Sequence, residues 1–105
     1  MAHDWVRLLG RSGVGVWQLL PLAPPDGTGS PYSSPSGSAL NPWLLDGEDL
    51  VREGAIRPAD LEAIPPGGTG RLVPEAAAAR ALAFGRALAL RWPEQSAGIQ
   101  KAFDL

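Results

Sequence analysis

The run from Val14 to Leu22, VGVWQLLPL, is apolar at nearly every position and most constrains how this chain can fold. A strand that is apolar on both faces is typical of a parallel sheet with helices on both sides. Such a strand needs neighbouring strands, and Gln18 within it needs hydrogen-bond partners in the interior. The sequence contains no second convincing strand, so we expect the chain to be part of a larger α/β domain.

A short helix is predicted upstream of this strand. Trp5, Leu8 and Leu9 follow the i, i+3, i+4 spacing of one helical face. Asp4 can cap the first turn, and Gly13 stands where a helix ends in the left-handed conformation. A helix, a glycine and a buried strand in this order indicate one unit of an α/β repeat.

A long loop rich in Gly, Pro and Ser follows the strand, from Ala23 to about Asn41, and carries Tyr32, the chain's one tyrosine. The loop buries little apolar area and offers this ring no core to enter. Polar loops that follow buried strands form binding sites in many α/β enzymes. The sequence therefore predicts half of a binding site here, although Tyr32 could also pack on its own loop with its hydroxyl in solvent.

Beyond the loop the sequence predicts short helices separated by Gly- and Pro-rich breaks. The predicted helices are Leu44 to Glu53, Pro58 to Ala63, Pro74 to Trp92 and Ser96 to Phe103. Residues 63–73 are predicted to be a linker, and residues 74–105 a helical segment. Within the longest helix, Leu82, Gly85, Leu88 or Ala89, and Trp92 can form one apolar stripe.

Composition narrows the possible functions. The net charge of −2 supplies no basic surface for nucleic acid or an anionic membrane. The chain has no cysteine and one histidine, which excludes a thiolate or His-based metal site and a Ser-His-Asp triad within it. No leader opens the chain, and no apolar run approaches the roughly 20 residues of a membrane span. We expect a cytoplasmic protein with no metal, no cofactor, no nucleic-acid partner and no membrane contact.

The acidic residues Asp46, Glu48 and Asp49 offer an alternative site, because glycosidases use two carboxylates about 5–10 Å apart. At the start of a helix, acidic side chains more often compensate the helix dipole, and we adopt that interpretation. Trp17 and Trp43 stand beside apolar runs, so both are expected in the core.

Three motifs occur together between residues 17 and 54. They are W-Q-x-L-P-L-x-P from Trp17 to Pro24, S-P-Y at Ser30 to Tyr32, and N-P at Asn41 and Pro42, followed by an acidic helix that ends at Gly54. In this order and separation the motifs resemble the N-terminal region of the 4-α-glucanotransferases of glycoside hydrolase family 77, the amylomaltases or disproportionating enzymes. The resemblance is clear over residues 5–62 and weak beyond Arg71.

This resemblance implies an α/β fold, namely part of a (β/α)₈ TIM barrel with its first helix, second strand, substrate loop and a mostly helical segment. It implies transfer of α-1,4-glucan segments between maltooligosaccharides with retention of configuration. Tyr32 and Ser30 are the substrate-binding residues that it implies. The family's three catalytic carboxylates have no counterpart here, so we expect no catalytic residue in this chain and no activity of the chain alone. The alternative is a small noncatalytic module that binds α-glucan or another protein.

Overall fold

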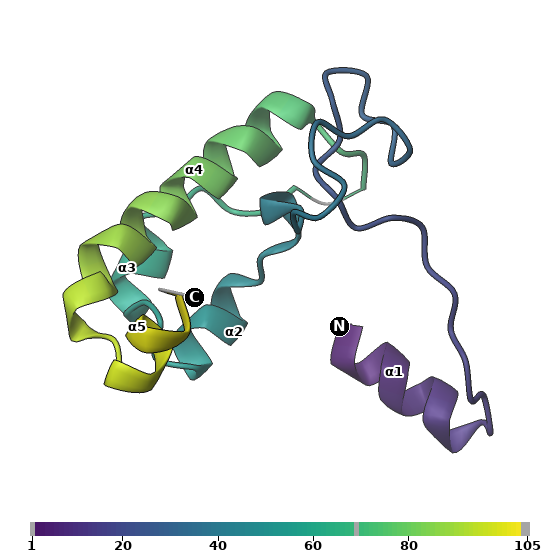
Figure 1. Ribbon diagram of the computed structural model, residues 1–105, viewed down its shortest axis with the longest axis horizontal. Coiled ribbons are helices and arrows are strands. Elements are labelled where there is room, and N and C mark those ends of the chain that lie inside the picture. Colours follow the sequence, from purple (N-terminus) through teal and green to yellow (C-terminus); the bar gives the residue numbers. More distant parts are fainter. Residues whose placement is uncertain (1, 69, 104–105) are drawn as a thin grey trace.

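The computed structural model describes residues 2–68 and 70–103, and its regular elements in those ranges are all helical. Figure 1 shows α1 apart from the other helices, joined to them by an extended segment and a loop. The elements are α1 (Ala2–Arg11), the short 3₁₀ helix η1 (Pro42–Leu44), α2 (Gly47–Arg52), α3 (Pro58–Glu62), α4 (Pro74–Arg91), the 3₁₀ helix η2 (Trp92–Glu94) and α5 (Ala97–Phe103). The helices predicted from the sequence are therefore confirmed, with small shifts of their ends.

Helix α1 ends as its sequence predicts. Gly13 has φ +77°, in the left-handed region that other residues rarely adopt, and the Val14 N–H donates to the Leu9 carbonyl oxygen at 3.0 Å. The predicted cap at Asp4 is wrong. Because the helix already begins at Ala2, Asp4 lies within the first turn, where its carboxylate accepts a hydrogen bond from Arg7 at 3.2 Å.

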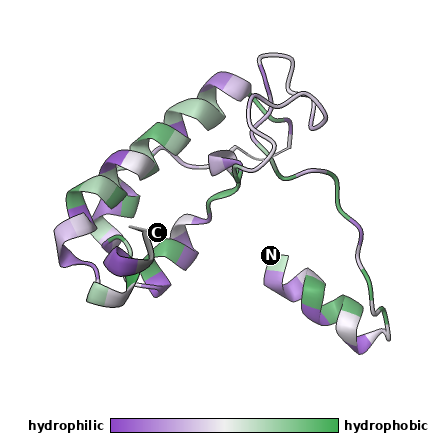
Figure 2. Ribbon diagram, viewed as in Figure 1, coloured by the Kyte–Doolittle hydropathy of each residue, from purple (hydrophilic) through white to green (hydrophobic). Residues whose placement is uncertain are grey.

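The strand predicted over residues 14–22 is not formed among the residues that the structure describes. These residues are extended, but they form no strand ladder in the part of the chain that the structure describes, and their backbone link to a later segment is the hydrogen bond from the Asn41 N–H to the Leu22 carbonyl oxygen. Their side chains are exposed, with Val16 at 85%, and Gln18 lies in solvent rather than in an interior. Figure 2 shows hydrophobic stretches along this segment, which crosses open space between α1 and the loop. A strand exists only through its neighbours, and the described chain offers none.

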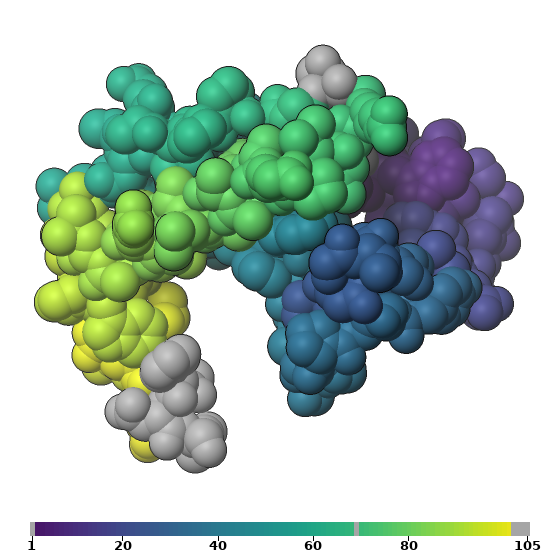
Figure 3. All heavy atoms as spheres, turned by 90° about the horizontal axis from the view of Figure 1, so that it is seen from above, coloured from purple at the N-terminus to yellow at the C-terminus, as the bar shows by residue number. Residues whose placement is uncertain are grey.

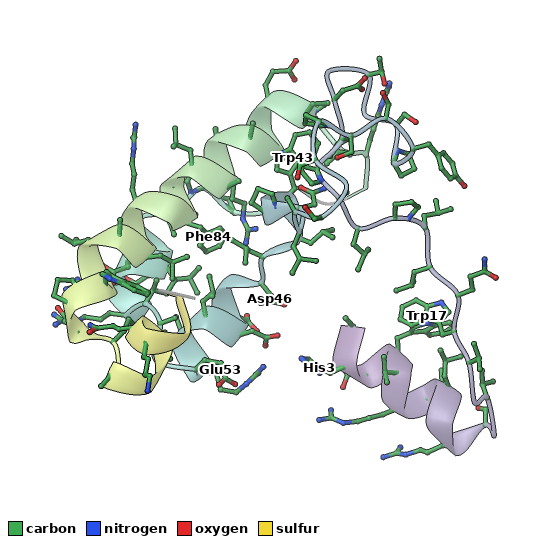
Figure 4. The ribbon with its side chains drawn as sticks, in the orientation of Figure 1. His3, Trp17, Trp43, Asp46, Glu53 and Phe84 are labelled. Carbon is green, nitrogen blue, oxygen red and sulfur yellow. The ribbon has the colours of Figure 1, made fainter. Side chains whose placement is uncertain are left out.

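A small core holds α2, α3 and α4 together. Phe84 of α4 is wholly buried and packs with Ile56 and Ile64. Figure 4 shows Phe84 directed from α4 toward the shorter helices. Gly47, the first residue of α2, lies against this ring, and a Cβ placed there would be 3.0 Å from Phe84 Cζ.

The predicted apolar stripe on α4 is correct only in part. Phe84, which the stripe did not include, is the residue that enters the core, while Leu82 remains 57% exposed. Gly85, Leu88 and Trp92 do share one surface, which forms an apolar groove with Ala55 and Ile99.

Charged side chains join α3 to the end of α4. The Arg91 guanidinium donates two hydrogen bonds of 2.8 Å to the Asp60 carboxylate, and these side chains are only 17% and 13% exposed. Asp60 also accepts from the Arg57 backbone N–H at 2.8 Å. The Arg91 hydrogen bonds, followed by the Arg57 N–H, lower the pKa of Asp60 to about 2. Glu94 accepts from both Arg57 and Arg91, so all four side chains form one network.

Candidate functional site

The loop between the extended segment and η1 is closed at its neck by backbone hydrogen bonding. The Asn41 N–H donates to the Leu22 carbonyl oxygen at 2.8 Å. The Asn41 side chain in turn accepts from the Trp43 N–H at 3.0 Å and caps η1, which packs against α4. The C-terminal end of the loop, at Asn41, is therefore anchored to α4 through η1.

Two consecutive turns form the tip of the loop. In the first, the Gly29 N–H donates to the Asp26 carbonyl oxygen at 3.0 Å, and in the second the Ser33 N–H donates to the Ser30 carbonyl oxygen at 3.2 Å. The Asp26 N–H donates to the Ser33 carbonyl oxygen at 2.8 Å, which joins the start of the first turn to the end of the second. Residues 26–33 thus form a closed unit, hereafter the double turn.

The Asp26 carboxylate accepts three hydrogen bonds from residues of the double turn. Its Oδ1 accepts from the Thr28 N–H at 2.8 Å and from the Thr28 hydroxyl at 2.5 Å, and its Oδ2 accepts from the Ser33 hydroxyl at 2.6 Å. These donors, with the Ser33 hydroxyl foremost, favour the charged form and lower the pKa of Asp26. Sequence reasoning did not single out Asp26. Its signal was available, because Asp two residues before Thr in a Gly-rich stretch is a common turn pattern.

Tyr32 projects from this unit into solvent. It occupies the third position of the second turn and is 76% exposed, so its ring does not pack on the loop. Ser30 lies beside it, and the Ser30 Oγ accepts a hydrogen bond from the Tyr32 N–H at 3.3 Å. In Figure 3 the loop residues, in blue, form a raised lobe at the surface of the molecule. The structure therefore brings the two predicted substrate-binding residues together on an exposed tip.

The two tryptophans flanking the loop differ in their surroundings. Trp43 of η1 is half-buried, whereas Trp17 in the extended segment is exposed and was wrongly expected in the core. The Trp17 ring meets Trp5 of α1 edge to face, with ring centroids 6.2 Å apart and an interplanar angle of 71°. Figure 4 shows Trp17 beside α1.

The acidic residues at the start of α2 act in the helix, as predicted. Asp46 is the N-cap residue, and its Oδ1 accepts from the N–H groups of Glu48 and Asp49 at 3.0 and 3.3 Å. Asp49 pairs with Arg52 one turn later and with His3 of α1, whose Nε2 lies 3.2 Å from Asp49 Oδ2. Figure 4 shows His3 facing this end of α2. These carboxylates are held by the helix and its partners, which gives no reason to assign them a glycosidase dyad.

Among residues 2–68 and 70–103, no three acidic or histidine side chains gather in a way that could hold a metal ion. Within the same ranges, no helix has both the length and the apolar character needed to cross a bilayer.

Several relatives that this chain matches are 4-alpha-glucanotransferases. The 4-alpha-glucanotransferase of Synechocystis sp. is 38% identical over 65 residues, which are 62% of this chain and 13% of that enzyme. The Thermus thermophilus enzyme of the same name is 42% identical over 59 residues, 56% of this chain and 12% of that enzyme. The chloroplastic/amyloplastic enzyme of Arabidopsis thaliana is 40% identical over 53 residues, 50% of this chain and 9% of its own length. The chain thus spans only a small part of the enzymes that it matches.

No solved structure matches this chain. The sequence profile of glycoside hydrolase family 77, described as 4-alpha-glucanotransferase, matches residues 1–102. Since this match covers almost the whole chain, the protein belongs to the 4-alpha-glucanotransferase family, glycoside hydrolase family 77.

Proposed function

We propose that this chain supplies the substrate loop of a 4-α-glucanotransferase, an enzyme that moves α-1,4-glucan segments between maltooligosaccharides. Family membership supports the reaction class, and the exposed Tyr32 on a closed double turn is the observation that carries the role of the loop. In the complete enzyme, residues 14–22 form a strand of a (β/α)₈ barrel. Active sites of such barrels lie on the loops after the strands, which is where the double turn falls. The enzyme works in the cytoplasm.

Tyr32 acts as a flat platform for one glucose unit. An aromatic face matches the apolar C–H face of a pyranose, and a ring that is already exposed needs no rearrangement to accept it. The contact gains importance as the sugar flattens toward its oxocarbenium-like transition state during retaining transfer.

Ser30 adds a hydrogen bond to the same sugar. Its Oγ accepts from the Tyr32 N–H, yet a hydroxyl keeps one hydrogen that it can donate. Ser30 therefore positions Tyr32 through its lone pair and contacts a sugar hydroxyl through its proton. No catalytic carboxylate is assigned to this segment, and the glucosyl-enzyme bond forms on a residue elsewhere in the barrel.

A graft into a relative tests this proposal. The Thermus thermophilus enzyme is 42% identical to this chain over 59 residues, and its segment that corresponds to residues 1–102 is replaced by those residues of this chain. We expect the chimaera to convert maltotriose into glucose and longer maltodextrins at a rate within about tenfold of the parent, because loop grafts onto a matching scaffold keep the catalytic groups in place.

Two controls accompany the graft. A chimaera with residues 23–40 replaced by a Gly/Ser linker of equal length, which keeps Asn41 as the cap of η1, should lose the activity while keeping its melting temperature. The 105-residue chain alone should release no glucose from maltotriose above a blank. Activity in the linker chimaera would refute the role assigned to the loop. Activity of the chain alone would refute the assignment of the catalytic carboxylates to residues elsewhere in the barrel.

A further inference from the structure

Asp26 is the best-connected side chain of the loop, and none of its hydrogen-bond partners lies outside the double turn. Its carboxylate binds the first turn through Thr28 and the second through Ser33, the residue that follows Tyr32. Its backbone N–H makes a third link, to the Ser33 carbonyl oxygen. Asp26 thus restrains the chain immediately after Tyr32 without touching the tyrosine ring.

The contacts of Tyr32 itself are too few to fix the ring. Its N–H bonds to Ser30 Oγ at 3.3 Å, and its side chain is 76% exposed. Packing therefore does not hold the ring in place. What restrains it is the loop around it. Asp26 ties that loop together through charge-assisted hydrogen bonds of 2.5–2.8 Å from the Thr28 N–H, the Thr28 hydroxyl and the hydroxyl of Ser33, the next residue after Tyr32.

We propose that Asp26 is the positioning residue for Tyr32, holding the double turn rigid so that the ring is presented to the glucan in its binding orientation. This inference rests on the proposed role of Tyr32 as a sugar platform. A platform that is ordered before binding avoids the entropy loss of ordering it during binding. Asp26 contributes to affinity in this way, although it contacts no sugar.

The first test follows the loop backbone in the grafted enzyme, without any glucan. Heteronuclear NOE values of the Tyr32 and Ser33 amides are measured by NMR in ¹⁵N-labelled protein. In the wild type we expect values close to those of α4. Asp26→Ala should lower them to values typical of a mobile chain, and Asp26→Asn should give intermediate values, because its amide oxygen still accepts from Thr28.

The controls separate the loop from the rest of the fold. Glu62→Ala removes an exposed carboxylate at the end of α3 and should change neither amide. The α4 amides should be unchanged in all variants. Rigid Tyr32 and Ser33 amides in Asp26→Ala, or mobile ones in the wild type, would overturn the proposal.

A pH series supplies a second readout. The Thr28, Tyr32 and Ser33 amide shifts should titrate together with one midpoint below the usual range of an aspartate, and this titration should vanish in Asp26→Asn. Independent midpoints at the three amides would contradict a single controlling carboxylate.

The third arm measures function in the grafted enzyme as a double-mutant cycle. Asp26→Ala alone should lower kcat/KM about three- to tenfold, which is the loss expected when one interface side chain must be ordered on binding. Combined with Tyr32→Ala it should cause no further loss, because the two residues act through one ring. Additive losses would refute the positioning role.

The arms also distinguish the two proposals. If Tyr32→Ala has no effect while the NMR arms behave as expected, the sugar platform is wrong and Asp26 still orders the loop. If Tyr32→Ala abolishes activity while Asp26→Ala leaves the Tyr32 amide rigid, the platform stands and the positioning role fails.

Discussion

At the scale of single residues, two positions show how side-chain size and charge decide local structure. Asp26 has a turn signal in the sequence, as an Asp two residues before Thr, but only the contacts show that it joins two turns. No sequence pattern predicts that Gly47 must lack a side chain. That requirement comes from Phe84, which lies 37 positions later in the chain and contacts Gly47 only in the folded core.

Gly47→Ala is expected to destabilise the fold by about 1–3 kcal/mol through overpacking. The added methyl group would clash with Leu61 Cδ1 and approach Phe84 Cζ to 3.0 Å. Gly37→Ala is the matched control, since a Cβ there meets no atom within 4 Å. The melting temperature of the grafted enzyme measures both, and equal values for the two variants would contradict the packing described for Gly47.

At the scale of elements, local signals were sufficient for helices and insufficient for the strand. Capping residues, first-turn prolines and helical spacing act within a few residues, so α2, α3, α4 and α5 could be predicted. Residues 14–22 have strand-like composition, but pairing depends on segments that the described chain lacks. The apolar stripe predicted on α4 was correct only in part for a related reason. Helical periodicity predicts which residues share a face, but it does not predict which neighbouring segment covers that face.

The junction between α3 and α4 should weaken in acid. The pKa of Asp60 is lowered to about 2, below its ordinary value of 3.8, by hydrogen bonds from Arg91 and from the Arg57 N–H. Its contribution to stability is therefore complete above the ordinary carboxyl pKa and is lost as the pH falls through about 2. The Arg57 amide shift, followed by NMR from about pH 5 downward, should report a midpoint of about 2.

Asp60→Asn removes the titrating group and should abolish this acidic step, while the Val16 amide of the extended segment stays unchanged in both proteins. A wild-type midpoint at 3.8 or above would contradict the ion pair with Arg91.

At the scale of the whole molecule, the chain has a small helical core beside a long exposed apolar segment. Phe84, Ile56 and Ile64 form the core, whereas Val16, Leu20 and neighbours stay in solvent. Exposed apolar surface of this extent usually marks an interface. The family could be recognised from the motifs around residues 17–42. The exposure of the apolar segment could not be predicted, because it depends on which segments pack against it and not on its own composition.

The isolated chain is expected to bind a dye such as ANS strongly and to show a broad thermal transition. Replacing Val16 and Leu20 together by Ser should remove much of the dye fluorescence, because both lie in the exposed segment, at 85% and 59% exposure. Leu90→Ser, an exposed position on α4, should remove less. A sharp two-state melt of a monomer without dye binding would favour an independent module over a barrel segment.

The most direct measurement of the central claim compares Tyr32→Ala and Tyr32→Phe in the grafted enzyme, using kcat/KM on maltotriose at unchanged melting temperature. Tyr32→Ala removes the whole ring and should lower kcat/KM by about 10²-fold, near 3 kcal/mol of transition-state stabilisation. Tyr32→Phe keeps the platform and loses one hydroxyl, so it should cost about tenfold at most. A kcat/KM of Tyr32→Ala close to that of the unmutated graft would show that the exposed ring does not bind the glucan, and would contradict the account.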